Sequence, residues 1–312
     1  MFELNKAEIE ALTAIKQGAT HHDQVAKEIK VSRSHANHLI SSLCEKGFLE
    51  KTRRGLTYEI RFTNNMFVEK FKRLIDAHLP LSKLLRGNKV TVLALFTGPL
   101  NRLSVSDLVL LTGLSKVTIW RYLTAWMDHG IMKKIPYGYR ISKSSALLKQ
   151  FLVEYSRFHC IKAVNDVSPG AVMLWNLGFE CVYSLPIGIE TTVGRTTGIA
   201  AFAENGVAFF GSREYRHIVA FDRRFDLADA ILDNVVIDPL NWTSMLNSLI
   251  CLGARTSLVE EDRLKHLAKA YGLGGLGSEM FDYIKTGNRA RETFPQYKEY
   301  RQKLALYLED GK

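Results

Sequence analysis

The amino-acid sequence predicts an α+β fold, with two tandem copies of one small helical unit that ends in a β-hairpin, followed by a different α+β domain with a helical tail. Three observations predict it. Shifting the chain against itself by 83 residues aligns apolar with apolar positions and glycine with glycine over roughly 45 residues, which indicates an internal repeat. Basic charge is concentrated in this repeated half. After residue 166, short β-rich runs and then helical patterns replace the repeat.

The length of 312 residues and the repeat predict three domains, which we expect at residues 1–80, 81–165 and 166–312. Residues 1–165 hold 26 Lys and Arg against 13 Asp and Glu, whereas residues 166–312 hold 16 against 19. The net charge of +10 therefore comes entirely from the repeated half. Such a distribution is typical of a nucleic-acid-binding region joined to a domain of another kind.

In the first copy, apolar residues at helical spacing predict three helices, over residues 6–17, 22–29 and 33–46. Gly18 and Gly47 follow the first and third helices as stop signals. Residues 48–62 alternate apolar and polar side chains on either side of Arg53-Arg54-Gly55, which predicts a hairpin with a basic tip. A connecting helix over residues 65–79 is closed by Pro80.

The second copy repeats this order. Helices are expected at residues 84–96, 104–111 and 116–129, followed by a shorter hairpin at residues 131–141 that turns at Tyr137-Gly138. Another amphipathic helix, over residues 146–158, leads out of the copy. We expect this helix and the connector at residues 65–79 to serve either in dimerisation or in domain packing, and the sequence does not choose between these roles.

The clearest part of the repeat is the segment 114–134, LSKVTIWRYLTAWMDHGIMKK. Ser115 is placed to cap a helix whose inner face carries Ile119, Leu123 and Met127. With the hairpin that follows, the segment resembles the winged-helix transcription regulators common in bacteria and archaea, and residues 32–51 share the pattern. The resemblance covers roughly the first 160 residues. It implies DNA binding, with the third helix in the major groove and the hairpin, or wing, over the backbone or minor groove.

We expect the outward-facing polar side chains of the two third helices and wings to contact DNA. In the first copy they are Arg33, Ser34, His35, Asn37, His38, Arg53 and Arg54; in the second they are Lys116, Thr118, Trp120, Arg121, Lys133, Lys134, Tyr139 and Arg140. Arg33, Asn37 and Arg121 are the candidates for reading bases, since arginine pairs with guanine and asparagine with adenine. Trp120 suits either a DNA contact or packing against the wing. Winged helices also serve as protein-docking modules, so a copy without DNA contact is the alternative.

In the C-terminal domain, which begins near Ser168-Pro169, we expect a helix or strand at residues 171–177 and strands at 180–185, 188–193, 198–210 and 215–221. The run 198–210 contains Asn205-Gly206, a strong hairpin signal. Helices are expected at residues 242–252, 262–271 and 295–308. The runs SPGAVMLWNLGFECVYSLP and NWTSMLNSLICLGART resemble the C-terminal domain of AbiEi-type antitoxins and autorepressors. The resemblance implies a regulatory, non-catalytic domain, although two winged helices depart from the single one of that type.

Patterns that would indicate chemistry fail on context. The glycine-rich YGLGGLG follows a helix and lacks the Lys-Ser/Thr of a phosphate-binding loop. The acidic run Asp222, Asp226, Asp229 and Asp233 is interpreted as a solvated helix start, and His217 and His266 as isolated. The four cysteines lack zinc-site spacing and are predicted to be buried, reduced thiols. We therefore predict no catalytic site, no metal and no cofactor.

The combined interpretation is a sequence-specific transcription regulator that binds double-stranded DNA and is not an enzyme. Its C-terminal domain is expected to serve dimerisation, to bind a protein partner or to sense a small-molecule effector. No apolar run approaches the about 18 residues of a membrane helix, which predicts a cytoplasmic protein without membrane contact. The alternative is a nuclease or nucleotidyltransferase brought to nucleic acid by the winged helices. The basic surplus argues against a third hypothesis, a protein-docking adaptor.

Overall fold

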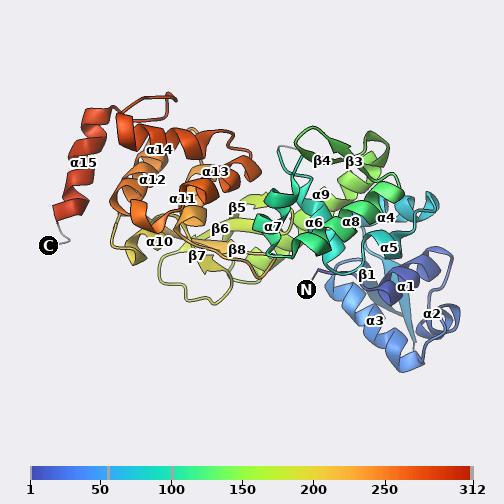
Figure 1. Cartoon of the computed structure of the whole chain (residues 1–312). Helices are drawn as coiled ribbons and strands as arrows, with labels where there is room; N and C mark the ends of the chain where they lie inside the picture. The colour runs from blue at the N-terminus through green and yellow to red at the C-terminus, as the bar shows by residue number, and fades with distance from the viewer. Residues whose placement is uncertain (1, 55–56, 100–101, 310–312) are drawn as a thin grey trace. The chain divides into compact units, whose positions relative to one another are not determined.

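The computed structural model describes residues 2–54, 57–99 and 102–309, and its helices and three antiparallel sheets form an α+β fold (Figure 1). The chain forms two compact units. The first comprises Met1–Thr97 and Trp120–His159, and the second Gly98–Ile119 and Cys160–Lys312. These units divide the chain differently from the predicted ranges 1–80, 81–165 and 166–312. Among the described residues, no helix is long and apolar enough to cross a membrane.

Both copies of the repeat have the predicted order of three helices and a hairpin. The first copy and its connectors comprise α1 (Lys6–Lys16), α2 (His22–Glu28), α3 (Arg33–Glu45), β1 (Leu49–Arg54), β2 (Thr57–Phe62), α4 (Met66–Asp76) and α5 (Leu81–Leu84). The second comprises α6 (Asn88–Leu95), α7 (Val105–Thr112), α8 (Lys116–Asp128), β3 (Met132–Ile135), β4 (Gly138–Ile141), the 3₁₀ turn η1 (Lys143–Ser145) and α9 (Ala146–Asn165).

The predicted offset of 83 residues holds at the level of elements. Helices α3 and α8 begin at Arg33 and Lys116, and each is 13 residues long. Buried residues correspond as well: Ala36, Ile40 and Leu43 of α3 match Ile119, Leu123 and Trp126 of α8. A serine precedes each helix and caps it. The hydroxyl of Ser32 accepts a hydrogen bond from the backbone N–H of His35, and the hydroxyl of Ser115 accepts one from the backbone N–H of Thr118. The cap at Ser115 is therefore confirmed.

Helix α4 and the part of α9 that precedes Cys160 pack inside the first unit. The ring of Phe48, just before β1, lies 5.0 Å from Phe67 and 5.1 Å from Phe71 of α4, measured between centroids. On its other side it lies 5.2 Å from Tyr155 of α9. Edge-to-face and tilted aromatic pairs add to the free energy gained from burial. This cluster identifies α4 and the first part of α9 as packing elements within the unit.

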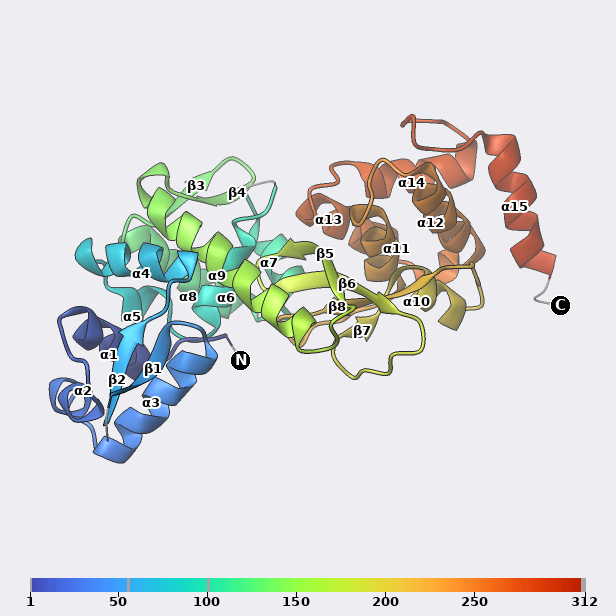
Figure 2. The same ribbon diagram turned by 180° about the vertical axis from the view of Figure 1, so that it is seen from behind.

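The second unit is built on a four-stranded antiparallel sheet in the order β5-β6-β8-β7. Its strands are β5 (Val172–Leu177), β6 (Glu180–Pro186), β7 (Arg195–Thr196) and β8 (Arg213–Ile218). Its helices are α10 (Gly198–Glu204), α11 (Leu227–Val236), α12 (Trp242–Ala254), η2 (Thr256–Leu258), α13 (Glu261–Ala270), α14 (Leu276–Thr286) and α15 (Tyr297–Glu309). Helix α11 lies at the centre of the helical layer, where it packs against α10, α12 and α13 (Figure 2).

Two predicted strands are wrong. Residues 188–193 form a turn and a loop before β7, because Gly188 has the left-handed φ of +86° that suits a turn and not a strand. Residues 198–204 form helix α10 rather than the first half of a hairpin. The run Gly198–Glu204 is rich in alanine, the strongest helix former, and lacks the β-branched residues that favour a strand, apart from Ile199. Asn205-Gly206 follows the helix, and Gly206 has a φ of +75°. A glycine in the left-handed conformation after a helix is a common helix stop, so the same dipeptide fits either structure.

Helix α7 belongs to the second unit although it lies within the repeat. It packs against α13, and Lys269 Nζ of α13 lies 3.8 Å from Asp107 Oδ2 of α7. Gly113, which ends α7, approaches the backbone so closely that an added Cβ would lie 2.9 Å from the carbonyl oxygen of Asp222. The residues that precede α8, the third helix of the second copy, are therefore packed on the C-terminal half of the chain.

Gly47 and Gly130 occupy equivalent places in the two copies and give a matched test of packing. Both have positive φ, +75° and +69°. An added Cβ at Gly47 would lie 2.5 Å from the ring of Phe158, whereas at Gly130 it would meet nothing within 4 Å. We expect Gly130→Ala to lower the free energy of unfolding by about 1 kcal/mol through backbone strain alone. Gly47→Ala should cost a further 1–3 kcal/mol, roughly, because the ring must move. Urea denaturation of both variants measures this difference, and equal losses would contradict the packing.

Candidate nucleic-acid interface and a buried ionic cluster

The outer face of α3 is polar throughout. Its five predicted contact residues are all exposed, whereas the intervening apolar residues are buried; the exposed ones are Arg33, Ser34, His35, Asn37 and His38. Three of the buried positions, Ala36, Ile40 and Leu43, follow the helical period. The helix thus has one face that holds it in the unit and another that offers hydrogen-bonding side chains to solvent.

The first hairpin lies next to this helix and extends its positive potential. Lys51 of β1 donates a hydrogen bond of 3.0 Å from Nζ to Ser41 Oγ of α3. Burial, followed by the charges of Lys51 and Arg33, lowers the pKa of His22. Arg33 also forms an exposed ion pair with Asp23 at 3.1 Å, a kind of pair that contributes little energy and can be exchanged for a phosphate. Arg53 is exposed, and the side chain of Arg54 lies outside the described residues.

The predicted contact residues of α8 differ in exposure. Lys116 and Arg121 are exposed, whereas Thr118 is half-buried and its hydroxyl lies 3.0 Å from Ser115 Oγ. The Trp120 ring stands edge-on to the ring of Tyr139 in β4, with 6.0 Å between centroids. Trp120 therefore packs against the hairpin, which is one of the two roles expected of it. It remains 39% exposed.

Tyr139 is buried, contrary to the prediction that it faces solvent. We expected it among the exposed residues of the hairpin, yet only 4% of it is exposed, and burial raises the pKa of its hydroxyl. The reason is the alternation of side chains along a strand: Arg140 points to solvent, so its neighbour Tyr139 points inward, against Trp120. Tyr139 supports the hairpin and leaves Lys133, Lys134 and Arg140 as its exposed polar residues.

Helix α8 and the β3–β4 hairpin carry more positive than negative charges. Residues 108–153 include seven Lys and Arg but a single carboxylate, Asp128. Within the part of the chain that the structure describes, Lys116, Arg121, Lys133, Lys134 and Arg140 form no ion pair. Cations that lack internal partners keep their full attraction for an external polyanion.

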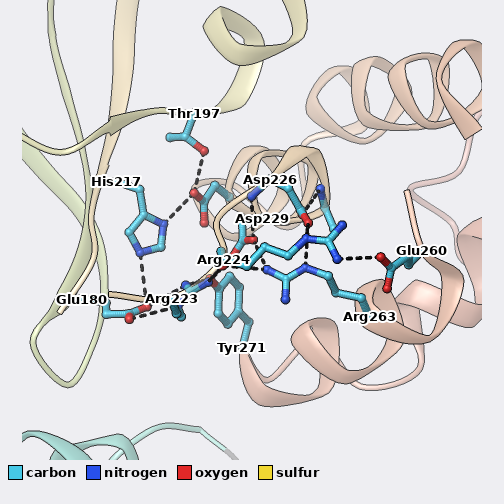
Figure 3. A network of polar contacts seen from close by, with 12 residues as sticks. Glu180, Thr197, His217, Arg223, Arg224, Asp226, Asp229, Glu260, Arg263 and Tyr271 are labelled. Atoms are coloured by element: carbon cyan, nitrogen blue, oxygen red, sulfur yellow. Dashed lines mark hydrogen bonds and ion pairs between the residues drawn. The ribbon is translucent and has the colours of Figure 1, made fainter. Parts of the chain in front are cut away.

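A cluster of charged groups is buried where the four-stranded sheet of the second unit meets its helices (Figure 3). Arg223 donates from Nη2 to Glu180 of β6 at 3.0 Å and from Nη1 to Asp229 of α11 at 2.7 Å. Arg263 of α13 donates to the other oxygen of Asp229 at 2.6 Å. The Tyr271 hydroxyl accepts from Arg223 at 3.3 Å. Two guanidinium groups therefore join the sheet to α11 and α13.

His217 of β8 completes the cluster. Its Nδ1 lies 2.7 Å from Asp233 Oδ2, and its Nε2 lies 3.4 Å from Glu180 Oε2. Burial opposes its protonation, but Asp233 and Glu180 outweigh burial and raise the pKa of His217 to about 10. Burial likewise opposes ionisation of Glu180, but Arg223 and His217 lower its pKa to about 2. With His217 protonated, three cations balance the three fully buried carboxylates Glu180, Asp229 and Asp233.

The cluster was missed by the sequence analysis, which interpreted the acidic run as solvated and His217 as isolated. Its geometry is that of a structural ionic network. Thr197 donates to Asp233 Oδ2, the same oxygen that His217 contacts. Thr197 is itself fully buried, so its hydroxyl is not accessible to a substrate in solution. Glu180, His217, Asp229 and Asp233 are each fully buried, which removes them from any substrate in solution. No group of three or more His, Cys, Asp or Glu among the described residues is arranged to hold a metal ion.

Comparisons of the chain with protein-family models, with curated protein sequences and with solved structures found no significant match.

The buried cluster predicts how stability changes with pH. The contribution of Glu180 is complete above its unfolded pKa of 4.5 and is lost as the pH falls towards about 2. The contribution of His217 is complete below its unfolded pKa of 6.5 and is lost as the pH rises towards about 10. Both contributions to stability are fully present only between pH 4.5 and pH 6.5. The measurement is the free energy of unfolding by urea from pH 3 to 10.

The matched control for this test is His266→Gln, since His266 is an exposed histidine on α13. We expect it to keep the alkaline decline of the wild type. His217→Gln should lose about 3–5 kcal/mol, because it leaves buried carboxylates without a partner, and should flatten the decline between pH 6.5 and 10. An equally steep decline in His217→Gln would contradict the protonated state of His217.

Proposed function

We propose that the chain is a sequence-specific transcription regulator that binds double-stranded DNA through two winged helices and is controlled through its C-terminal region. The observation that carries the proposal is the set of exposed cations on α8 and the β3–β4 hairpin, which form no ion pair with any residue that the structure describes. Duplex DNA is a dense polyanion, and neutralising its phosphates releases counterions, which drives binding. We further propose that the protein acts in the cytoplasm as a homodimer, which would place two copies of the interface on related half-sites.

The two copies supply the elements that major-groove binding requires. A major groove admits one α-helix, and α3 and α8 are each long enough, at 13 residues, to cross it. In winged helices this third helix enters the groove and the hairpin contacts the backbone beside it. The polar outer face of α3 and the cationic residues of both hairpins support this assignment.

The roles of individual side chains follow from their chemistry. Arg33, Asn37 and Arg121 are assigned to base edges, because guanidinium and amide groups can bond to a base through two atoms. Lys116, Lys133 and Lys134 are assigned to phosphates, which hold the protein in register without reading sequence. Arg121 lies five residues after Lys116, which is about 500° around the helix and about 7.5 Å along it. The two side chains therefore point in different directions and divide these roles.

The alternative function, a nuclease or nucleotidyltransferase, requires carboxylates that can reach a metal ion and substrate. In the second unit, the best candidates for such carboxylates are Glu180, Asp229 and Asp233. These residues are buried and bonded to Arg223, Arg263 and His217. Their burial favours the regulator over the enzyme.

The double substitution Lys133→Ala with Lys134→Ala tests the phosphate contacts. Each lost contact should reduce the slope of log affinity against log salt by about 0.9, so the pair should reduce it by about 1.8. The control is Lys285→Ala with Lys303→Ala, two lysines of the second unit that pair with Glu261 and Glu299. Fluorescence anisotropy with a labelled duplex over a salt series gives both slopes. A control that changed the slope equally would remove the β3–β4 hairpin from the interface.

Arg121→Ala tests base reading. On a duplex selected for tight binding, we expect a loss of about 1–3 kcal/mol, whereas binding to random duplex should change little. Lys116→Ala should weaken both duplexes alike, because a phosphate contact is independent of sequence. The measurement is the ratio of the two affinities for each variant. If Arg121→Ala weakened both duplexes equally, specificity would have to come from Arg33 and Asn37 in the first copy.

A further inference from the structure

A groove of about 450 Å³ lies within the second unit, between α7 and α13. Its apolar wall is formed by Val105, Val109 and Leu110 of α7, all half-buried. Its polar wall includes Arg263 and His266 of α13, and Lys116, the first residue of α8, stands at its edge. This volume lies in the range of small-molecule sites, which are about 300–1,000 Å³ and combine an apolar wall with a few polar groups.

Two of the charged residues that line the groove, Arg263 and Glu260, are held in short ion pairs. Arg263 is bonded to Asp229 and Asp226, and Glu260 to Arg224 at 2.6 Å. Asp262 lies 3.9 Å from Lys265 Nζ. Lys116 has no carboxylate partner among the residues that the structure describes. The groove therefore offers one uncompensated positive charge beside an apolar wall, which is complementary to an anion with an apolar body.

The polar wall is held in place by the buried ionic cluster. The two guanidinium bonds of Arg263 to α11 and to the turn before it orient its side chain. His266 Nδ1 lies 2.7 Å from the carbonyl oxygen of Asp262, which leaves Nε2 available to a ligand. A wall whose side chains are already ordered loses little conformational entropy when a ligand binds.

We propose that the α7–α13 groove binds a small carboxylate with an apolar body, whose carboxylate pairs with Lys116, and that this ligand weakens DNA binding. The effect on DNA binding rests on the proposed function, in which Lys116 contacts a DNA phosphate. One ammonium group cannot be fully engaged by both anions, so the ligand competes with DNA at the start of α8. The coupling is reciprocal: DNA lowers the affinity for the carboxylate by the same factor.

The first experiment measures ligand binding to the full-length chain without DNA. The probes are 2-naphthoate and 2-naphthylmethylamine, which share a ring system and carry opposite charges, and calorimetric titration measures their affinities. We expect saturable binding of the naphthoate and at least tenfold weaker binding of the amine. Lys116→Met, which keeps the apolar stem, and Val109→Asp, which places a carboxylate in the groove, should each weaken naphthoate at least tenfold. The control Leu306→Asp changes an exposed residue of α15 and should have no effect.

Three results would overturn the site: no saturable naphthoate binding at millimolar concentration, equal affinity for the amine, or wild-type naphthoate affinity in Val109→Asp. The second experiment adds 2-naphthoate to the protein bound to labelled duplex. We expect the duplex to dissociate, and dissociation to be lost in Val109→Asp. Naphthoate binding with unchanged DNA affinity would overturn the coupling and leave the site standing. A protein that binds no duplex would overturn the proposed function, while the calorimetric result would still decide the site.

Discussion

The second unit depends on the burial of six ionic groups in one charge-balanced cluster. Glu180 comes from β6, His217 from β8, Asp229 and Asp233 from α11, Arg263 from α13, and Arg223 from the segment before α11. Buried ion pairs add little net stability, but removing one partner leaves an uncompensated charge that costs about 3–5 kcal/mol. Every element that contributes a charge is therefore held at the position where its partner lies. The cluster fixes the sheet against α11 and α13, and α13 in turn packs against α7.

This constraint extends to the repeated half of the sequence. Helix α7 lies in the second copy of the repeat but packs on α13, and Gly113 at its end lies against the backbone of Asp222 and Arg223. Lys116 follows within the same unit. Lys116, which we propose to contact phosphate, also lines the α7–α13 groove. We therefore propose the start of α8 as the place where the C-terminal region influences DNA binding.

The sequence predicted local features well and long-range ones poorly. The repeat, the serine cap at Ser115 and the buried faces of α3 and α8 follow from periodicity and capping rules, which depend on residues close in sequence. The ionic cluster joins Glu180 to residues more than 35 positions away, so no short motif contains it. A signal was nevertheless present. Asp229 and Asp233 lie one turn apart in the apolar run LADAILDNVV, which indicates a buried helix whose carboxylates need cationic partners.

We propose that the chain recognises a particular DNA sequence, and selection from a random duplex library is the test of that proposal. Full-length protein would be incubated with labelled random duplexes at physiological salt, and the bound molecules would be amplified and sequenced over successive rounds. Our account predicts one enriched motif that binds at least a thousandfold, roughly, more tightly than random duplex. A pool that remained random after repeated rounds, or that bound no better than the starting library, would contradict it.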